Sequence, residues 1–407
     1  MKKVLYITYD GLTDPLGQSQ IIPYLQGLTK QGYQFTILSF EKKERYHKEG
    51  GLIKQITDEA GIFWNPLFFS KNPPILSKIY DRWKMRKMAK KLHRQYKFDL
   101  IHCRSYIAAE IGLYLKKKTR VKFLFDMRGF WADEKVDNGQ WDLKNPLFKK
   151  IYRHYKKKEK EFLLHADAIV SLTEAAKNEL LKKQEYKSLD IDVIPCCADL
   201  TLFNYENFDL NSDGAFKKQL GISSDQKIIA YLGSVGGWYM THEMFLFYKQ
   251  LLEKYPSFIM LFLTKDDPSK VLQEAEAAGI PGKKIMVMYA ERKVLPKYLD
   301  ICDCSIFFIR PTYSKMASSP TKHAELMGMG IPVICNDIGD TGTIINKTNS
   351  GLIVEKFTEQ EYDKIINQVP GFLKLDKKQI RKAALQHFDL SDGIAKYLQI
   401  YNRVIGI

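Results

Sequence analysis

The stretch Ser319 to Ile334, SPTKHAELMGMGIPVI, predicts a helix, a glycine-rich turn and a short strand in immediate succession. Ser319 is a suitable N-cap, and Pro320 would then occupy the first helical position. The helix is expected to span Thr321–Met327, and the strand Val333–Asn336 follows it. A helix that leads through a glycine turn into a strand is the repeating unit of a parallel α/β sheet.

The same alternation of strand and helix runs through most of the chain. Short apolar runs such as Val4–Thr8, Phe35–Phe40 and Lys227–Leu232 predict strands, and segments with helical periodicity separate them. This order favours parallel sheets that are covered by helices on both faces. The polar segment Asp199–Asp225, rich in Asn and Asp, interrupts the pattern, and we interpret it as a connection between domains.

The length of 407 residues is too great for one ordinary hydrophobic core, because soluble chains usually divide into domains of roughly 100–200 residues. We therefore predict two α/β domains, residues 1–203 and 204–389. The last apolar helix, Ile394–Ile407, is expected to pack back on the first domain, so that residues 390–407 belong to it.

The net charge of +16 favours an anionic binding partner, which could be a nucleic acid, an anionic membrane surface or an anionic small substrate. The charge is concentrated in two helix-like runs, Lys84–Arg94 and Lys149–Lys158. The sequence has no recognition-helix, zinc or RNP motif, so we do not expect nucleic acid as a partner.

The sequence does not predict a metal site. Its six cysteines form no CxxC pair, and no His cluster has the spacing of zinc ligands. The run Asp190-Ile191-Asp192 has DxD spacing, but it leads into a strand of the first domain, away from the glycine loops. Thiols within apolar runs suit a reducing cytoplasm.

The N-terminal apolar run is expected to be a first strand and not a signal peptide, because Asp10 ends it after six residues. No run of 18 or more apolar residues, the length that would span a bilayer, occurs in the sequence.

Two glycine-containing loops lie directly after predicted strands. The first runs from Gly11 to Ser19 and includes Gly17 and Gln18, and the second begins with Gly233 and Ser234. Glycine lets a backbone approach a phosphate closely, and open α/β sheets bind ligands at the carboxyl ends of their strands. For both loops, an ordinary strand–helix turn remains the alternative.

Lys322 and Glu325 lie one helical turn apart on the same face of the helix that Ser319, Pro320 and Thr321 begin. A cation in the first turn opposes the helix dipole, and this mismatch is resolved if an anion binds there. A carboxylate one turn later is suited to accept hydrogen bonds from two ribose hydroxyls. A surface Lys–Glu pair is the alternative interpretation.

This segment resembles the donor site of the retaining glycosyltransferases of family 4, which have the GT-B fold. The matching residues are Pro320, Lys322, Glu325, Gly330 and Pro332-Val333-Ile334. Gly11–Gln20 and Asp126–Glu134 resemble a bacterial surface-polysaccharide subgroup, and Val193–Asp199 resembles the end of the family's first domain. The resemblance implies two Rossmann-like domains that face each other across a cleft, with the C-terminal helix packed on the N-terminal domain.

The resemblance implies that a sugar is transferred, with retention, from a nucleoside-diphosphate sugar to a glycan or lipid-linked saccharide in cell-surface polysaccharide synthesis. UDP is the expected nucleotide, and no metal or other cofactor is implied, because helix N-termini and basic side chains neutralise the leaving diphosphate. The predicted donor-binding residues are Gly17, Gln18, Gly233, Ser234, Arg310, Ser319, Pro320, Thr321, Lys322 and Glu325. Asp126, Arg128 and Glu325 are predicted to be catalytic, and Asp133 and Glu134 to bind the acceptor.

Two departures from the family pattern matter. Ala317 stands eight residues before Glu325, where many members have an acid, and Arg128 stands where many have a His. Arg310 and Lys322 are candidates for the cation that the family places after its second glycine loop. A local salt-bridge cluster is the alternative for the acidic residues after the strand that ends at Asp126.

The two basic helices are expected to dock the protein on an anionic membrane surface, at the cytoplasmic side of the cell membrane. Solvated helix faces are the alternative. Two other function classes stay open, a non-catalytic glycosyltransferase-like subunit, suggested by Ala317, and a GT-B nucleotide-sugar epimerase.

Overall fold

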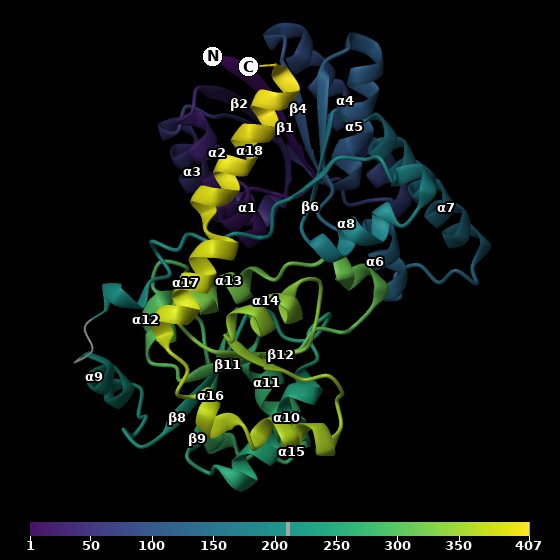
Figure 1. The fold of residues 1–407 in the computed structure, drawn as a ribbon. Coiled ribbons are helices and arrows are strands. Elements are labelled where there is room, and N and C mark those ends of the chain that lie inside the picture. The colour runs from purple at the N-terminus through teal and green to yellow at the C-terminus, as the bar shows by residue number, and fades with distance from the viewer. Residues whose placement is uncertain (209–211, 407) are drawn as a thin grey trace. The chain divides into compact units, whose positions relative to one another are not determined.

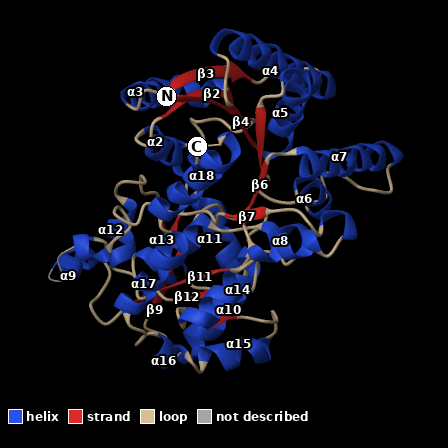
Figure 2. Cartoon of the chain, turned by 45° about the horizontal axis from the view of Figure 1, so that its top comes forward, coloured by secondary structure: helices blue, strands red, loops and turns tan. Residues whose placement is uncertain are grey.

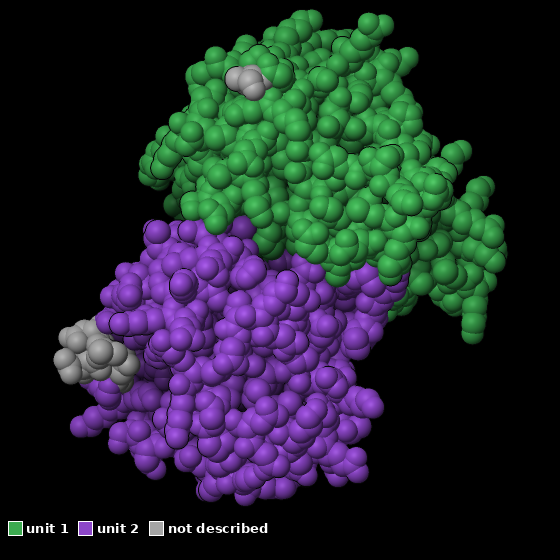
Figure 3. Space-filling view, in the orientation of Figure 1, with its two compact units in different colours: residues 1–196, 390–407 green, residues 197–389 purple. Residues whose placement is uncertain are grey.

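The computed structural model describes residues 1–208 and 212–406. The chain forms two compact units, Met1–Cys196 with Leu390–Ile407, and Cys197–Asp389 (Figure 3). Each unit contains one parallel sheet whose strands alternate along the chain with helices that cover the sheet (Figures 1 and 2). The prediction of two Rossmann-like domains is therefore confirmed.

The sheet of unit 1 has seven parallel strands in the order β3-β2-β1-β4-β5-β6-β7. Their bounds are β1 (Lys2–Thr8), β2 (Tyr33–Glu41), β3 (Phe63–Phe68), β4 (Leu100–Arg104), β5 (Lys122–Asp126), β6 (Ala168–Ser171) and β7 (Ile191–Val193). The strand order reverses between β1 and β4, whose carboxyl ends meet where Thr8 pairs with Arg104. Open α/β sheets bind their ligands beyond the carboxyl ends of the strands at such a switch point.

The helices of unit 1 are α1 (Pro15–Gln20), α2 (Ile22–Thr29), α3 (Lys43–Glu59), α4 (Pro74–Tyr96), α5 (Ser105–Thr119), α6 (Trp131–Asp137), α7 (Pro146–His165), α8 (Glu174–Leu181) and α18 (Leu390–Ile405), with a 3-10 turn η1 (Gln184–Tyr186).

The single helix predicted over Ser19–Gln31 is wrong, since the backbone leaves the helical conformation at Ile21. Pro23 explains the break, because a proline has no N–H to donate and restricts the residue before it. Gly17 and Gln18 consequently lie in a helix and not in an open loop.

The C-terminal helix α18 packs on α2, within unit 1 (Figure 1). A Cβ atom on Gly27 would lie 2.3 Å from Ile394 Cδ1, so only glycine allows this close approach. The ring of Tyr397 lies edge-on to that of Tyr24, and the Tyr33 hydroxyl donates to Asn402 Oδ1 over 2.6 Å. The predicted return of the C-terminal helix to the N-terminal domain is confirmed, although α18 begins four residues before the predicted start, and Ile407 lies outside the described residues.

The sheet of unit 2 has six parallel strands in the order β10-β9-β8-β11-β12-β13. Their bounds are β8 (Lys227–Leu232), β9 (Phe258–Leu263), β10 (Ile285–Met288), β11 (Cys304–Phe307), β12 (Val333–Cys335) and β13 (Gly351–Ile353). The strand order reverses between β8 and β11, so the loops after these two strands lie at the switch point of this sheet.

The helices of unit 2 are α9 (Ser212–Gln219), α10 (Thr241–Lys254), α11 (Pro268–Ala277), α12 (Leu295–Asp300), α13 (Thr321–Gly328), α14 (Thr341–Thr348), α15 (Glu359–Ile366), α16 (Val369–Phe372) and α17 (Lys377–Phe388), with 3-10 turns η2 (Tyr205–Asn207), η3 (Gly282–Lys284) and η4 (Tyr313–Ala317). The predicted connection Asp199–Asp225 contains η2 and α9, and residues 209–211 within it lie outside the described part.

All six cysteines are buried, in agreement with their interpretation as structural thiols. Among the described residues, no helix combines the length and the apolar character that crossing a membrane requires.

A buried carboxylate holds the turn that follows β1. Glu41 Oε1 accepts hydrogen bonds from the Leu12 N–H at 2.8 Å and the Ser39 hydroxyl at 2.6 Å. Glu41 Oε2 accepts from the Thr13 N–H at 3.1 Å and the Thr13 hydroxyl at 2.6 Å. Four donors on one fully buried carboxylate join the end of β2 to the first glycine loop.

Glu41→Ala is expected to destabilise unit 1 by about 3 kcal/mol, because it leaves the buried N–H groups of Leu12 and Thr13 without an acceptor. The measurement is urea unfolding followed by tryptophan fluorescence, since Trp64, Trp83, Trp131 and Trp141 all lie in this unit. Glu44→Ala is the control, because the Glu44 side chain is 82% exposed. Equal unfolding midpoints for both variants would contradict the assignment.

Candidate functional site

The glycine loop after β8 has a fixed shape. Gly233 adopts a φ of 119°, a backbone conformation that side chains other than glycine rarely allow. The Tyr231 hydroxyl donates to the Ser234 carbonyl, and the Val235 N–H donates to Asp266 Oδ2 over 2.6 Å. The Gly236 N–H donates to the Thr241 hydroxyl over 3.0 Å. The loop is therefore held from the strand before it and from the helix after it.

Lys322, in the first turn of α13, extends its ammonium group to this loop. A Cβ atom on Gly233 would lie 2.8 Å from Lys322 Nζ, so the ammonium group lies directly against the backbone of this glycine. Nζ lies 3.6 Å from the ring centroid of Tyr239 and 4.3 Å from that of Tyr231. The ammonium group is buried and makes no hydrogen bond to any described residue.

The ammonium group of Lys322 lies in an unfavourable electrostatic environment. Burial lowers the pKa of Lys322 well below its ordinary value, and the charge of Glu325 only partly opposes this shift. A buried ammonium without a hydrogen-bond acceptor is costly, and its place at a helix N-terminus adds the unfavourable dipole. An anion at this point would remove both costs, because the cation and the free N–H groups of the helix would then bind it.

The predicted start of α13 at Thr321 is confirmed, but its N-cap differs by one residue from the prediction. Pro320 has extended backbone angles, φ −71° and ψ 119°, so it occupies the N-cap position and the helix begins at Thr321. The prediction that Ser319 is the N-cap is therefore wrong. Lys322 still lies in the first turn, which is the feature on which the anion-site interpretation depends.

Glu325 is buried and paired with an arginine that the sequence patterns did not identify. Arg292, between β10 and α12, donates from Nη1 to Glu325 Oε1 over 2.6 Å, and its guanidinium lies 5.0 Å from the ring centroid of Phe203. Burial raises the pKa of Glu325, and the charge of Arg292 opposes this. The feature of the sequence that could have identified Arg292 is its position just after the carboxyl end of β10.

Arg310 reaches the same glycine loop from the segment after β11. Its exposed side chain donates from Nη2 to the Gly237 carbonyl at 3.5 Å, and its backbone N–H donates to the Trp238 carbonyl at 2.9 Å. Two cations from separate segments, Lys322 and Arg310, thus converge on the loop that begins at Gly233. The structure brings these predicted donor residues of unit 2 together at the switch point of one sheet.

The predicted catalytic residues of unit 1 lie in a buried charged cluster. Asp126, at the end of β5, is 1% exposed. Its Oδ1 lies 3.7 Å from Arg128 Nη1, and its Oδ2 lies 3.8 Å from Arg104 Nη1 and 3.4 Å from His102 Nε2. Burial raises the pKa of Asp126, but the nearby cations, above all Arg128, outweigh it and lower the pKa overall.

This cluster also joins unit 1 to its C-terminal helix. His102 Nδ1 lies 2.7 Å from the hydroxyl of Tyr401 in α18, and burial lowers the pKa of His102, so the ring is neutral at pH 7. Arg128 adopts a φ of 57°, a strained conformation for this residue, and its Nη2 donates to Cys196 Sγ. A catalytic role for Asp126 and Arg128 stays a prediction.

The two predicted acceptor-binding residues lie on α6. Asp133 is buried, and its two oxygens accept from the Tyr152 hydroxyl and from Lys156 Nζ, each over 2.8 Å. These contacts fit the salt-bridge alternative, because they fasten α6 to α7. Glu134, the next residue, is partly exposed. An acceptor-binding role for either residue stays a prediction.

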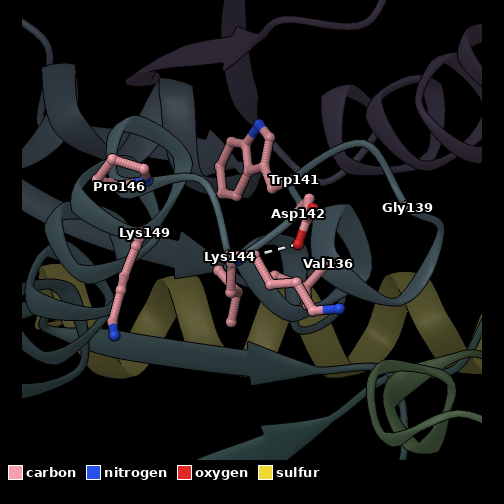
Figure 4. Close-up of a pocket in the computed structure, with 8 residues that line it drawn as sticks. Val136, Gly139, Trp141, Asp142, Lys144, Pro146 and Lys149 are labelled. Atoms are coloured by element: carbon pink, nitrogen blue, oxygen red, sulfur yellow. Dashed lines mark hydrogen bonds between the residues drawn. The ribbon is translucent and has the colours of Figure 1, made fainter.

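A pocket of about 840 Å³ lies beside α6 and the start of α7 (Figure 4). It is lined by Val136, Gly139, Trp141, Asp142, Leu143, Lys144, Pro146 and Lys149. The Trp141 ring stacks on Tyr155 of α7 and lies edge-on to Trp131 of α6. An aromatic wall with lysines beside it is suited to a sugar ring that carries an anionic group.

The first glycine loop is closely packed. A Cβ atom on Gly17 would lie 2.3 Å from the Gly11 carbonyl oxygen, so this glycine serves the packing of its own turn. Gln18 Nε2 donates to Glu49 and to the Thr13 carbonyl. In the DxD run, both carboxylates pair with Arg403 of α18.

Comparison with known proteins identifies the family to which the chain belongs. A family model described as Glycosyltransferase Family 4 matches residues 21–202, and a second, described as Glycosyl transferases group 1, matches residues 212–384. Together they span most of the chain. The chain belongs to the family 4 glycosyltransferases.

Individual relatives are distant in sequence. A D-inositol 3-phosphate glycosyltransferase of Nocardia farcinica is 21% identical over 71% of this chain, and the match spans 61% of that relative's length. The solved sucrose-phosphate synthase of Thermosynechococcus elongatus matches with a TM-score of 0.74 at 14% identity, over 100% of both chains. Anabaena HepE in complex with UDP and glucose matches with a TM-score of 0.70 at 14% identity, over 99% of this chain and 100% of that one. These structures share the GT-B fold with this chain.

Ala317 is the point where this family 4 glycosyltransferase departs most clearly from the expected donor site. It is 2% exposed and ends η4, so no carboxylate stands at this position. Close by in the sequence, Lys315 places Nζ 3.8 Å from the ring centroid of Trp238. The side of the glycine loop that carries Trp238 therefore presents a cation and an aromatic ring.

Lys322→Met is expected to stabilise the glycosyltransferase by about 1 kcal/mol at pH 7, because it replaces a buried ammonium without a hydrogen-bond partner by an apolar chain of similar shape. The folded-state pKa of Lys322 lies below its unfolded value, so between the two values the unfolded chain binds more protons and wild-type stability rises with pH. The gain should therefore shrink from pH 7 to pH 9.

The measurement is urea unfolding at both pH values. Lys364→Met is the matched control, because Lys364 also lies three residues from a glutamate but is 60% exposed. A Lys322→Met variant that is less stable than wild type, or a gain that does not change with pH, would contradict the electrostatic assignment.

Proposed function

We propose that this family 4 glycosyltransferase transfers a sugar from a UDP-sugar, with retention at the anomeric carbon and without a metal ion. The observation that carries the proposal is the buried ammonium of Lys322, which lacks a hydrogen-bond partner among the described residues and lies against the glycine loop at a helix N-terminus. A diphosphate supplies the anion that this arrangement lacks.

Each residue of the donor site then has a separate role. The diphosphate lies between the loop that begins at Gly233 and the first turn of α13, where Lys322 and Arg310 meet its charge. Glu325 accepts the ribose hydroxyls, and Arg292 holds the carboxylate in place from Nη1. As the bond to the sugar breaks, negative charge develops on the diphosphate, and these preorganised cations and N–H groups stabilise it.

The choice of UDP is supported by the solved relatives. Structures of Anabaena HepE contain UDP, UDP with glucose, or UDP-glucose. Their fold extends over nearly the whole of this chain. The carboxyl edge of the second sheet, where Lys322 meets the glycine loop, is the proposed nucleotide site here.

Retention fits a front-face reaction, in which the acceptor attacks from the side of the leaving group and the departing phosphate takes the acceptor proton. Such a reaction needs no pair of opposed carboxylates, which suits a site with Ala317 where many members have an acid. In this proposal, Asp126 and Arg128 orient the reacting groups from the carboxyl end of β5.

The proposed acceptor is a glycan or a lipid-linked saccharide in cell-surface polysaccharide synthesis, bound by unit 1 at the inner face of the cell membrane. The pocket beside α6 supports this, because Trp141 offers a stacking surface for a sugar ring while Lys144 and Lys149 offer positive charge. Glu134, on the same helix as Val136 of the pocket lining, is the proposed hydrogen-bond acceptor for the saccharide.

A second candidate is a glycosyltransferase-like subunit without transferase activity, which the buried Ala317 favours. Release of UDP from labelled UDP-sugars distinguishes the two, and a thermal-shift screen of nucleotide sugars selects the donor for that assay. If the protein binds a nucleotide sugar but releases no nucleotide with any acceptor or with water, the second candidate stands and the transferase proposal fails.

Lys322→Ala and Glu325→Ala are each expected to weaken UDP binding at least tenfold, about 1.4 kcal/mol, because they remove the contacts to diphosphate and to ribose. Isothermal titration with UDP measures this. The matched controls are Lys364→Ala and Glu361→Ala, an ion pair on α15 with the same spacing of three residues and an exposed lysine, and both should bind UDP as wild type does. Unchanged affinity in both site variants would refute the site.

A further inference from the structure

Helix α4 is apolar on two opposite faces. Its inner face packs in unit 1 through Ser77, Asp81, Met85, Ala89 and Leu92, each at most 5% exposed. Asp81 on this face accepts from the N–H and the hydroxyl of Ser70 and pairs with Lys84. The inner face therefore packs α4 on the domain, and Arg82 and Arg86 add contacts to Tyr155 and Tyr114.

The outer face carries a stripe of large apolar side chains. Leu76, Ile79, Tyr80 and Trp83 follow the spacing i, i+3, i+4, i+7 and are 61%, 50%, 52% and 53% exposed. The rings of Tyr80 and Trp83 stack with their centroids 5.7 Å apart. Single exposed apolar residues are ordinary, but a contiguous stripe over two turns marks an interaction surface.

Basic residues continue the outer face toward the end of α4. Arg86, Lys87, Lys91 and Arg94 are exposed, and Lys87 Nζ lies 5.0 Å from the ring centroid of Trp83. The helix contains eight Lys and Arg residues and one acid, the buried Asp81. Its exposed surface therefore divides into an apolar first half and a basic second half.

We propose that α4 docks this protein on an anionic lipid bilayer, with Leu76, Ile79, Tyr80 and Trp83 entering the interfacial region and the later cations binding lipid headgroups. Aromatic residues favour the membrane interface, because one end of each ring is apolar and the other is polar. Lys and Arg near an anionic leaflet add electrostatic attraction, and their long stems let the charge reach the headgroups. The inference rests on the proposed function for a membrane-bound acceptor and names the residues that dock.

The chemistry of the face favours a bilayer over other occupants. A nucleic acid would bind the cations, but it offers no apolar surface for Leu76 and Ile79. A second copy of the chain would bring two helices of high positive charge together, and like charges repel. A bilayer satisfies both halves of the outer face at once, the apolar stripe in the interface and the cations among anionic headgroups.

The docking helix lies beside the proposed acceptor pocket. Arg82 of α4 donates from Nη1 to the Tyr155 hydroxyl over 2.7 Å, and the Tyr155 ring stacks on Trp141 of the pocket. Figures 1 and 2 show α4, α5 and α7 on the same side of unit 1. Docking through α4 therefore brings the pocket near the membrane, where a lipid-linked saccharide would lie.

The test is co-sedimentation of the full chain with vesicles of phosphatidylcholine, with and without phosphatidylglycerol. Wild type is expected to bind the anionic vesicles, and Ile79→Ser/Tyr80→Ser/Trp83→Ser to bind them at least tenfold more weakly. Leu52→Ser/Leu272→Ser/Tyr289→Ser is the matched control, since these residues are 60%, 40% and 53% exposed elsewhere, and it should bind as wild type does.

Two further measurements separate the contribution of the cations to vesicle binding from that of the apolar stripe. Lys87→Gln/Lys91→Gln should weaken vesicle binding at low salt, while at high salt it should match wild type, because salt screens the headgroup attraction. Tryptophan emission should shift to the blue on vesicle binding, and Trp83→Phe should lose most of this shift. A blue shift that Trp83→Phe retains in full would overturn insertion of the stripe.

Other outcomes would also overturn the proposal. These are no binding to anionic vesicles, equal binding by the stripe variant and wild type, or a wild-type dimer that the stripe variant dissociates. Titration with UDP on the same proteins keeps the two proposals apart. Vesicle binding without UDP binding leaves the docking in place and removes the proposed function, whereas UDP binding without vesicle binding does the reverse.

Discussion

The contact between Lys322 Nζ and the glycine loop after β8 sets the geometry of the candidate donor site. The φ of 119° requires glycine at position 233, and the ammonium group reaches this glycine because α13 begins at the switch point of the sheet. The aromatic rings of Tyr231 and Tyr239 enclose the cation and give it partial compensation through their π faces. Folding therefore places an uncompensated charge where strand ends and a helix N-terminus already favour anions, a combination that reduces stability and prepares binding.

Much of this arrangement could be predicted from the sequence, because it is local. The spacing of Lys322 and Glu325 fixes their shared helix face, and Gly328 to Pro332 predicts the turn into β12. Local patterns were insufficient at Ser319, because the extended ψ of Pro320 makes Pro320 and not Ser319 the N-cap. They were also insufficient at Ile21, where Pro23 divides one predicted helix into two.

The contacts that the sequence could not supply join residues far apart in the chain. Arg292 pairs with Glu325 because β10 ends and α13 begins at the same edge of one sheet, a consequence of strand order and not of spacing. His102 contacts Tyr401, nearly three hundred residues later, because α18 returns to unit 1. The sequence pattern also does not tell which apolar face of α4 is buried. Both faces carry apolar residues, and only the packing shows that Met85 is buried and Trp83 is exposed.

The charged residues of unit 1 form two different arrangements, a buried cluster at the ends of β4 and β5 and an exposed face on α4. The buried cluster pairs the carboxylate of Asp126 with Arg104 and Arg128, and it fastens the ends of β4 and β5 to α18 through His102. On the outer face of α4, the apolar stripe and the side chains of Lys87, Lys91 and Arg94 face solvent, while Arg86 lies over the Tyr114 ring of α5. Stability explains the first arrangement and gives no reason for the second, because two exposed aromatic rings beside a row of lysines contribute little to folding. The proposed docking on a bilayer accounts for this outer face of α4.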